Sequence, residues 1–190
     1  YLLFMLMLCP IMMLQAKTNE LVYNAVVAQD GSGKYTTVQA AIDAAPTGLK
    51  KPWMIYIKSG SYNELVTVPQ NKPFIYLLGE NRQNTIIHYN LNIGAAPENM
   101  NPKFHVPDVY WKSSIHNPSL PIYNKQMAVV VVDAGDFYAQ NLSFVNDYGV
   151  AVQDGPQALA MQNKGDRTAF YNCNFRSFQD TWMTTQKNDA

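Results

Sequence analysis

The sequence has few cysteines and histidines, and their positions exclude several kinds of site. Its 190 residues include two cysteines, Cys9 and Cys173, and the first lies in an apolar N-terminal run. Removal of that run leaves Cys173 alone, so no internal disulfide and no CxxC metal or redox site can form, and Cys173 is expected to be a small buried apolar residue. The three histidines, His88, His105 and His116, fit no metal-ligand spacing. We therefore expect no metal and no cofactor.

No charge of either sign predominates. The chain has 14 basic and 14 acidic side chains and a formal net charge of zero. Without a basic or acidic run it has no long-range attraction for a phosphate backbone or an anionic membrane surface, so nucleic acid is not an expected partner. A composition of 47% hydrophobic and 15% charged residues is typical of a single globular domain with a substantial core.

The longest apolar run is at the N-terminus. It extends from Leu2 to Leu14, which is too short to span a bilayer but has the length of a signal-peptide core. A buried strand or helix is the alternative, but Met and Leu dominate the run without periodicity. We expect residues 1–16 to be the remnant of a signal peptide. Residues 17–190 would then form the mature domain, secreted or periplasmic, monomeric and without membrane contact.

The start of this domain predicts a strand, a turn and a short helix. A strand is expected at 25–28, followed by a tight turn containing the sequence GSGK, which lacks the residue spacing of a phosphate-binding loop. Apolar residues then recur at helical spacing over 36–45. Thr36 and Gln39 form a capping box, and Pro46 marks the end of the helix.

From residue 53 onward the sequence consists of short β-rich runs separated by turn residues. The runs are MIYIKSG, ELVTVPQ, FIYLLGEN, NTIIHY, AVVVVDAG, FYAQNLSF and AFYNCNF. Because no amphipathic helices lie between them, they exclude a doubly wound α/β fold and leave a sandwich, a barrel or a solenoid.

A loose internal repeat favours the solenoid. The apolar runs 127–132 and 158–161 are each followed by a similar series of residue types. The series are Gly135, Asp136, Phe137, Tyr138 and Asn141, and Gly165, Asp166, Phe170, Tyr171 and Asn174. Such recurrent coils predict a parallel β-helix, an all-β fold whose terminal coil must be covered. The helix at 36–45 is the candidate cap.

Residues 90–126 interrupt this pattern as a Pro-rich loop insertion. They contain five of the chain's eleven prolines, and also Phe104, Tyr110, Trp111 and Tyr123. A loop of this length in a compact fold is usually functional or disordered. Its aromatic rings, Tyr110 and Trp111 in particular, either stack against the sugar rings of a substrate or pin the loop to the wall of the solenoid.

Two polar motifs remain as candidates for chemistry, because the chain has no GxSxG nucleophile elbow. GPQALAMQ contains Gln157, and FQDT contains Gln179 and Asp180. Gln157 and Gln179 are 22 residues apart in the sequence, about one coil, so their side chains could lie close together on adjacent turns. Taken alone, Asp180 is either an acid/base group or a turn or cap residue.

Three other polar residues have structural interpretations. Asn141 begins an NLS glycosylation sequon, but an Asn inside a strand that bonds along the stack of coils is favoured over a modified one. Asp154 and Asp166 are expected to be turn residues.

Taken together, the motifs resemble the pectin methylesterase family. The matching blocks are VAQDGSGKYTTVQAAIDAAP at 27–46, GSYNE at 60–64, LLGEN at 77–81, PQALAM at 156–161 and FYNCNFRSFQDT at 170–181. They occur in the family's order and cover nearly all of the chain after the leader, so the combination is highly specific.

The resemblance implies a right-handed parallel β-helix and an enzyme that hydrolyses the C6 methyl esters of galacturonate units in pectin, releasing methanol. Asp180 matches the family's acid/base Asp, Gln179 its neighbour in the QDT motif, and Gln157 the Gln of its QA motif. In the family a second Asp attacks the ester carbonyl, and the Gln amides donate hydrogen bonds to the developing oxyanion. Phe178 and Gln157 are expected to contact the substrate, methyl-esterified homogalacturonan.

The chain also departs from the family pattern. Ser177 and Phe178 stand where Gly and Tyr are frequent in plant members, and the Pro-rich loop is longer, which favours a bacterial-type subgroup. The family's nucleophile lies in a downstream DFIFG-like motif and its substrate-orienting Arg in a GRPW-like motif, and the chain contains neither. We therefore expect an inactive fragment. A non-catalytic pectin-binding β-helix is the first alternative; a β-helical polysaccharide lyase is disfavoured because no cluster of acidic calcium ligands is present.

Overall fold

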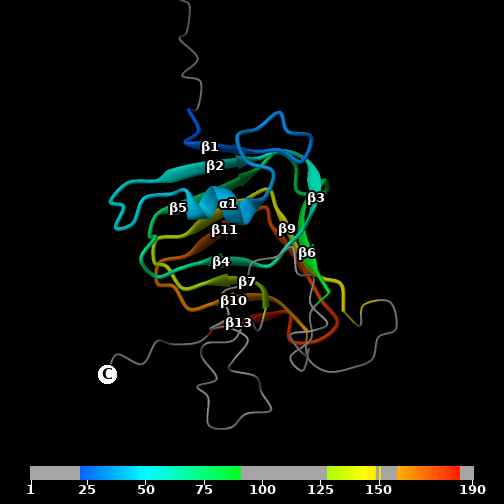
Figure 1. Cartoon of the computed structure of the whole chain (residues 1–190). Coiled ribbons are helices and arrows are strands. Elements are labelled where there is room, and N and C mark those ends of the chain that lie inside the picture. The colour runs from blue at the N-terminus through cyan, green and yellow to red at the C-terminus, as the bar shows by residue number, and fades with distance from the viewer. Residues whose placement is uncertain (1–21, 91–127, 149, 151–157, 185–190) are drawn as a thin grey trace, which may run out of the picture.

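The chain folds into parallel strands stacked in successive coils (Figure 1). The computed structural model describes residues 22–90, 128–148, 150 and 158–184. Within these ranges there are thirteen β-strands and one α-helix. Every strand pairing among them is parallel.

The strands form three sheets. Sheet 1 contains β1 (Ala25–Val27), β2 (Trp53–Ile57), β5 (Ile75–Gly79), β8 (Tyr138–Gln140) and β11 (Ala169–Tyr171). Sheet 2 contains β3 (Gly60–Asn63), β6 (Thr85–Tyr89), β9 (Ser143–Asn146) and β12 (Asn174–Arg176). Sheet 3 contains β4 (Val66–Val68), β7 (Ala128–Val132), β10 (Leu159–Asn163) and β13 (Trp182–Thr184). From β2 onward the chain passes from sheet 1 to sheet 2 to sheet 3 and back, which confirms the predicted parallel β-helix.

The internal repeat is present, and the structure gives its register. Similar residue types recur at offsets of 30 residues (Gly135 and Gly165) and 33 residues (Tyr138 and Tyr171), whereas in the structure Tyr138 pairs with Ala169, an offset of 31. The offset of 31 residues continues into sheet 2, where Phe144 pairs with Phe175 and the two rings stack with centroids 5.2 Å apart. The register follows the packing of interior side chains, and similarity of type on the outer face does not reveal it.

The interior is filled by alternate residues of each strand. In β2 and β5 the inward residues are Ile55, Ile57, Ile75 and Leu77, all fully buried. Their neighbours in sequence point outward and are half-buried. Towards the last described coils aromatic rings replace the aliphatic side chains, as in the stack of Phe144 and Phe175. This alternation explains why the β-rich runs could be recognised from sequence.

One short helix, α1 (Val38–Asp43), contacts β1, β2 and β4 and lies over the first coils (Figure 1). The predicted cap of the solenoid is therefore confirmed, but its boundaries and its capping box are corrected. The N-cap is Thr37, whose hydroxyl accepts a hydrogen bond from the backbone N–H of Ala40 at 3.3 Å. Gln39 does not reach back to the cap; its amide group bonds to the backbone of Thr67 in β4, which ties the helix to sheet 3.

Charged side chains from the first full coil hold both ends of α1. The carboxylate of Glu64 accepts hydrogen bonds from the backbone N–H groups of Val38 and Gln39, at 2.8 and 2.9 Å. The ammonium of Lys72 donates to the last carbonyls of the helix, at 2.9 Å from the oxygen of Ile42. An anion at the N-terminus and a cation at the C-terminus both match the helix dipole.

The turns between sheets 1 and 2 are tight because their residues adopt left-handed backbone conformations. Asn141 and Asn172 have φ of +56° and +49°, and the side-chain amide of Asn172 donates to that of Asn141 at 2.6 Å. The expectation that Asn141 bonds along the stack is confirmed. It lies in a turn directly after β8, however, and not in a strand, because Asn tolerates the left-handed region that the turn requires.

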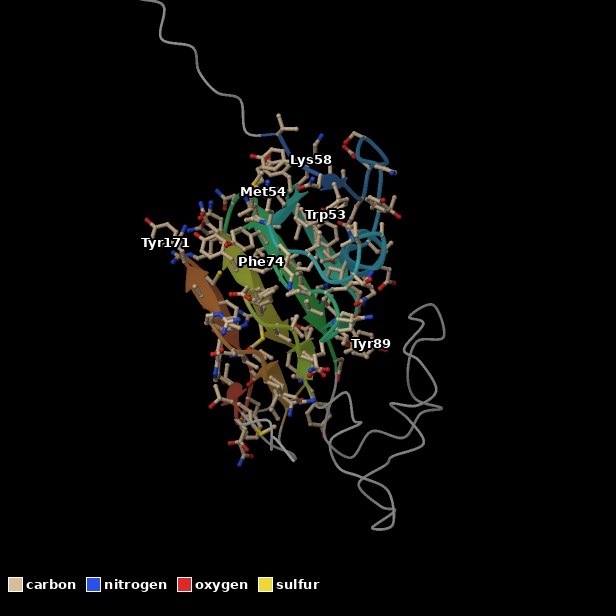
Figure 2. All side chains as sticks on the ribbon, turned by 90° about the vertical axis from the view of Figure 1, so that its left-hand side faces the viewer. Trp53, Met54, Lys58, Phe74, Tyr89 and Tyr171 are labelled. Carbon is tan, nitrogen blue, oxygen red and sulfur yellow. The ribbon has the colours of Figure 1, made fainter. Side chains whose placement is uncertain are left out.

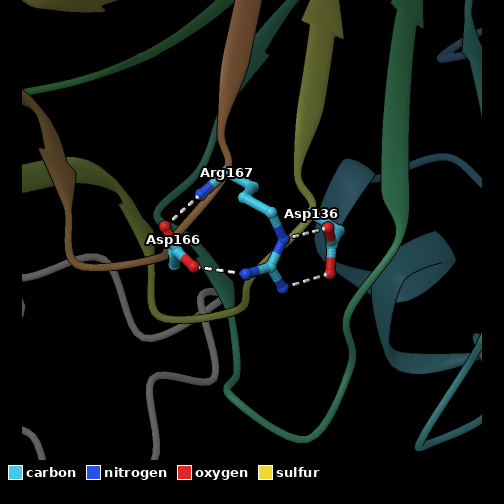
Figure 3. A network of polar contacts seen from close by, with 3 residues as sticks. All are labelled: Asp136, Asp166 and Arg167. Carbon is cyan, nitrogen blue, oxygen red and sulfur yellow. Dashed lines mark hydrogen bonds and ion pairs between the residues drawn. The ribbon is translucent and has the colours of Figure 1, made fainter.

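A second pair of left-handed residues connects the turns before β8 and β11. Arg167 donates two hydrogen bonds to the carboxylate of Asp136, at 2.7 and 2.9 Å, and a further one to Asp166 (Figure 3). The hydrogen bonds from Arg167 lower the pKa of Asp136 below its usual value. Asp166 is a turn residue, as expected.

The remaining predictions either concern residues that the structure does not describe or can be compared with it directly. The leader, the Pro-rich loop and Asp154 lie outside the described residues. Cys173 is a free thiol that is half-buried, less than expected, and it packs against the core. No helix in the described part of the chain is long and apolar enough to cross a membrane.

Candidate functional site

The motif FQDT lies in the turn between β12 and β13, which we call the QDT turn (residues 177–181). Asp180 has φ of +53° and its side chain is exposed. Asp is one of the few residues that adopts this conformation without a large penalty. Within the described residues no hydrogen bond or ion pair reaches the carboxylate of Asp180. Its carboxylate is therefore presented to solvent from a fixed turn.

Hydrogen bonds on both sides of Asp180 fix the backbone of the QDT turn. The hydroxyl of Ser177 donates to Thr181 Oγ1 at 2.9 Å, which closes the turn on itself. The backbone N–H of Ala158 donates to the carbonyl of Gln179 at 3.2 Å, and that of Ala160 to the carbonyl of Thr181 at 3.1 Å. The two residues that flank Asp180 are thus anchored to the preceding coil at β10.

The predicted proximity of the two glutamine motifs is supported on the backbone level only. Gln157 itself lies outside the described residues, as do Tyr110 and Trp111. Ala158, the next residue after Gln157, bonds to Gln179 across adjacent coils. The side chain of Gln179 is exposed, and Phe178 is half-buried in the same turn.

An aromatic cluster packs beside the QDT turn. The ring of Trp182, directly after the turn, packs edge-on against Phe170 and Phe175, with centroids 4.9 and 4.7 Å apart. Phe175 in turn stacks on Phe144 of the coil above. Edge-to-face pairs of this kind stabilise a fixed ring orientation, so the start of β13 is held in place.

Two buried amides near this turn were not predicted. Gln162, in β10, pairs with Met183 of β13; it is 3% exposed and its Oε1 has no hydrogen-bond partner among the described residues. The amide of Asn146 donates to the carbonyl of Leu159 at 2.9 Å and fixes the start of β10. In the sequence, the one sign of Gln162 as a special position is its place in the apolar run LAMQN. In the structure its buried, unpaired amide oxygen is unusual, because buried polar atoms normally have a hydrogen-bond partner.

The structure also aligns three polar side chains on sheet 2 that the sequence does not bring together. Ser61 Oγ lies 2.9 Å from His88 Nε2, and His88 Nδ1 lies 2.5 Å from the carboxylate of Asp147. They come from β3, β6 and the residue after β9, on three successive coils. In the described part of the chain no three His, Cys, Asp or Glu side chains form a group that could hold a metal ion.

Comparison with known proteins identifies the family. The family model described as Pectinesterase matches residues 24–102 and 115–189. The chain belongs to the pectinesterase family. Pectinesterase 4 of Arabidopsis thaliana is 34% identical over 158 residues, which cover 83% of this chain and 22% of that protein.

Solved structures of pectin methylesterases share the fold. The enzyme from carrot superposes with a TM-score of 0.66 at 32% identity, over 88% of this chain and 44% of that chain. A pectin methylesterase in complex with a hexasaccharide gives 0.64 at 28% identity, over 86% of this chain and 46% of that chain. The pectinesterase chain described here thus spans less than half the length of these relatives.

Proposed function

We propose that this chain is part of a pectin methylesterase that hydrolyses the C6 methyl esters of homogalacturonan to free carboxylates and methanol. Membership of the pectinesterase family and the likeness to a pectin methylesterase solved with a hexasaccharide support the substrate class. The observation that carries the proposal is the QDT turn, which holds an exposed carboxylate, Asp180, on anchored backbone. We also propose that the protein is exported and acts as a monomer.

Asp180 is the general acid and base in this proposal. A second Asp, expected downstream of the QDT motif, attacks the ester carbonyl and forms an acyl-enzyme. Asp180 gives its proton to the departing methoxide, so that methanol leaves, and then takes a proton from the water that hydrolyses the acyl-enzyme. The exposure of Asp180 suits this role because water and methanol must both reach its carboxylate.

The glutamines supply the hydrogen-bond donors. Gln157 and Gln179 would donate their amide N–H groups to the oxyanion that develops as the ester carbonyl is attacked. The bond between Ala158 and Gln179 supports this pairing, because it holds the two motifs on adjacent coils. Phe178, half-buried beside Asp180, would contact the sugar ring, and Tyr110 and Trp111 are proposed as further substrate contacts.

The test is mutation in the protein that also contains the downstream Asp. Asp180→Asn should lower methanol release from methylated pectin by about 10²- to 10⁴-fold while preserving the fold, because the proton donor is lost. Gln157→Ala should lower kcat by about 10²-fold and raise KM less, because an oxyanion donor acts mainly in the transition state.

Asp166→Asn is the matched control. Asp166 also lies exposed in a turn of the solenoid, but its carboxylate bonds to Arg167. Activity should remain close to that of the unmodified enzyme. Near-normal turnover by a correctly folded Asp180→Asn protein would refute the role of Asp180, and retained binding without any turnover in the unmodified protein would favour a non-catalytic pectin-binding β-helix.

A further inference from the structure

The outer side of sheet 1 carries a band of tyrosines that the catalytic proposal does not use. It consists of Tyr23, Tyr56, Tyr76, Tyr138 and Tyr171, which we call the tyrosine face. The rings of Tyr23 and Tyr56 stack with centroids 4.7 Å apart, and those of Tyr76 and Tyr138 lie 5.2 Å apart. Tyr171 is 64% exposed and projects from the ribbon (Figure 2).

The register of the strands produces this arrangement. In-register pairing places outward side chains of successive coils above one another, about 4.8 Å apart. One column contains Met54, Tyr76 and Tyr138. The other contains Tyr56, Leu78, Gln140 and Tyr171. The face is therefore a broad apolar surface that runs along the axis of the solenoid, interrupted by one amide.

An open depression of about 370 Å³ lies between these columns. Aromatic and aliphatic side chains line most of it, and the polar groups come from Glu80, Gln140 and Asn141. The hydroxyl of Tyr138 donates to Gln140 Oε1 at 2.8 Å, which orients that amide. Ring faces combined with a few oriented polar groups are the usual composition of a site for a small organic ligand. The C–H groups of pyranose rings pack well on such ring faces.

The charge of the depression selects among sugars. Among the described residues that line it, Glu80 is the one charged side chain, and the nearby Lys58 ammonium favours its ionised form. Its carboxylate accepts a hydrogen bond from the backbone N–H of Ser59 at 2.8 Å, and this bond lowers the pKa of Glu80. Glu80 is therefore negative at neutral pH and repels an anionic sugar acid. A methyl-esterified uronate carries no charge and avoids this repulsion.

We propose that the tyrosine face binds methyl-esterified stretches of homogalacturonan, at a surface separate from the QDT turn. The identity of the polymer rests on the proposed function, whereas the location rests on the columns of tyrosines and the depression between them. A second contact of this kind would keep the protein on methylated polymer and release it where the chain has become anionic.

Binding of methylated and demethylated oligogalacturonides of equal length, measured by calorimetry, tests this proposal. Tyr56→Ala and Tyr76→Ala should each weaken binding of the methylated oligomer roughly three- to tenfold, since each removes one stacking ring. Tyr56→Phe and Tyr76→Phe keep the rings and should bind like the unmodified protein. Because the ligand is uncharged, added salt should leave its affinity unchanged.

Three results would overturn the proposal: unchanged affinity in both alanine variants, tighter binding of the demethylated oligomer, or equal binding of a neutral glucan of the same length. Circular dichroism melting controls for folding, and Tyr171→Ala replaces any variant that unfolds, because Tyr171 is largely exposed. Asp180→Asn separates this proposal from the catalytic one. It should lower turnover by about 10²- to 10⁴-fold and leave the binding to the tyrosine face intact.

Discussion

Glu64 offers a sharp test of how α1 is attached to the solenoid. Glu64 is 2% exposed, and its carboxylate accepts two hydrogen bonds at the N-terminus of α1, from Val38 and Gln39. Replacement by Ala leaves both N–H groups without their partner, and that of Val38 is fully buried. At about 1–3 kcal/mol for each donor left unsatisfied, Glu64→Ala should lower the free energy of unfolding by roughly 2–6 kcal/mol.

The stability that Glu64 contributes should also change with pH, in a direction that follows from its pKa. Burial raises the pKa of Glu64 above its usual 4.5, although the two N–H groups partly oppose the shift. From pH 4.5 up to the folded pKa the native state therefore binds more protons than the unfolded state, and stability falls as pH rises. Glu64→Gln cannot ionise, so its deficit relative to the unmodified protein should be largest below pH 4.5 and smaller at neutral pH.

Glu80→Gln is the matched control with the opposite sign. Glu80 is exposed, and its pKa is lowered by the hydrogen bond from the Ser59 N–H group. Its contribution to stability is present above the usual Glu pKa and is lost as pH falls, so this deficit should shrink in acid. Urea denaturation of both variants across this range of pH measures the two slopes. A deficit of Glu64→Gln that is constant, or that grows towards neutral pH, would refute the reasoning.

Two further substitutions test packing and backbone conformation, and an alkylation rate tests burial. Gly165→Ala would place its Cβ 1.9 Å from the carbonyl oxygen of Ala134, so the backbone must move. We expect the free energy of unfolding to fall by about 3 kcal/mol, the upper end of the usual range for overpacked sites. Gly31→Ala, with open space but φ of +78°, should lose only about 1–2 kcal/mol. Burial raises the pKa of the Cys173 thiol, so its alkylation by iodoacetamide at neutral pH should be slower than that of a free cysteine peptide, and equal rates would contradict the half-buried position.

The fold could be predicted where side chains alternate between interior and surface. The strands β2 and β5 follow this pattern closely, and both were expected. The strand β3 was not, because Gly, Ser and Asn are poor strand formers. It forms because Tyr62 enters the core and the backbone pairs with β6. The helix α1 was expected two residues longer at each end than observed, since Glu64, distant in sequence, supplies part of the cap that local residues were thought to provide.

For the candidate site, the sequence alone does not distinguish a structural role of Asp180 from a catalytic one. A QD pair among aromatics allows a turn or a polar site. The structure shows that Asp180 is a left-handed turn residue, whereas its catalytic role stays a proposal based on the family resemblance. Four other left-handed turn residues help to separate the two roles. Asn141 and Asn172 bond to one another, and Asp136 is paired with Arg167, so each of these side chains takes part in stabilising its corner.

Asp180 differs from those residues in the use of its side chain. Its turn is closed by the hydroxyls of Ser177 and Thr181 and by backbone bonds to β10, none of which involves the carboxylate. Among the described residues nothing neutralises or satisfies that carboxylate, although its neighbours on both sides are fixed. Water can hydrate this exposed side chain, so the turn is closed without its help, and Asn or Gly would adopt the same left-handed conformation. The turn geometry alone therefore gives no reason for Asp at this position, and the acid/base role that we propose supplies one.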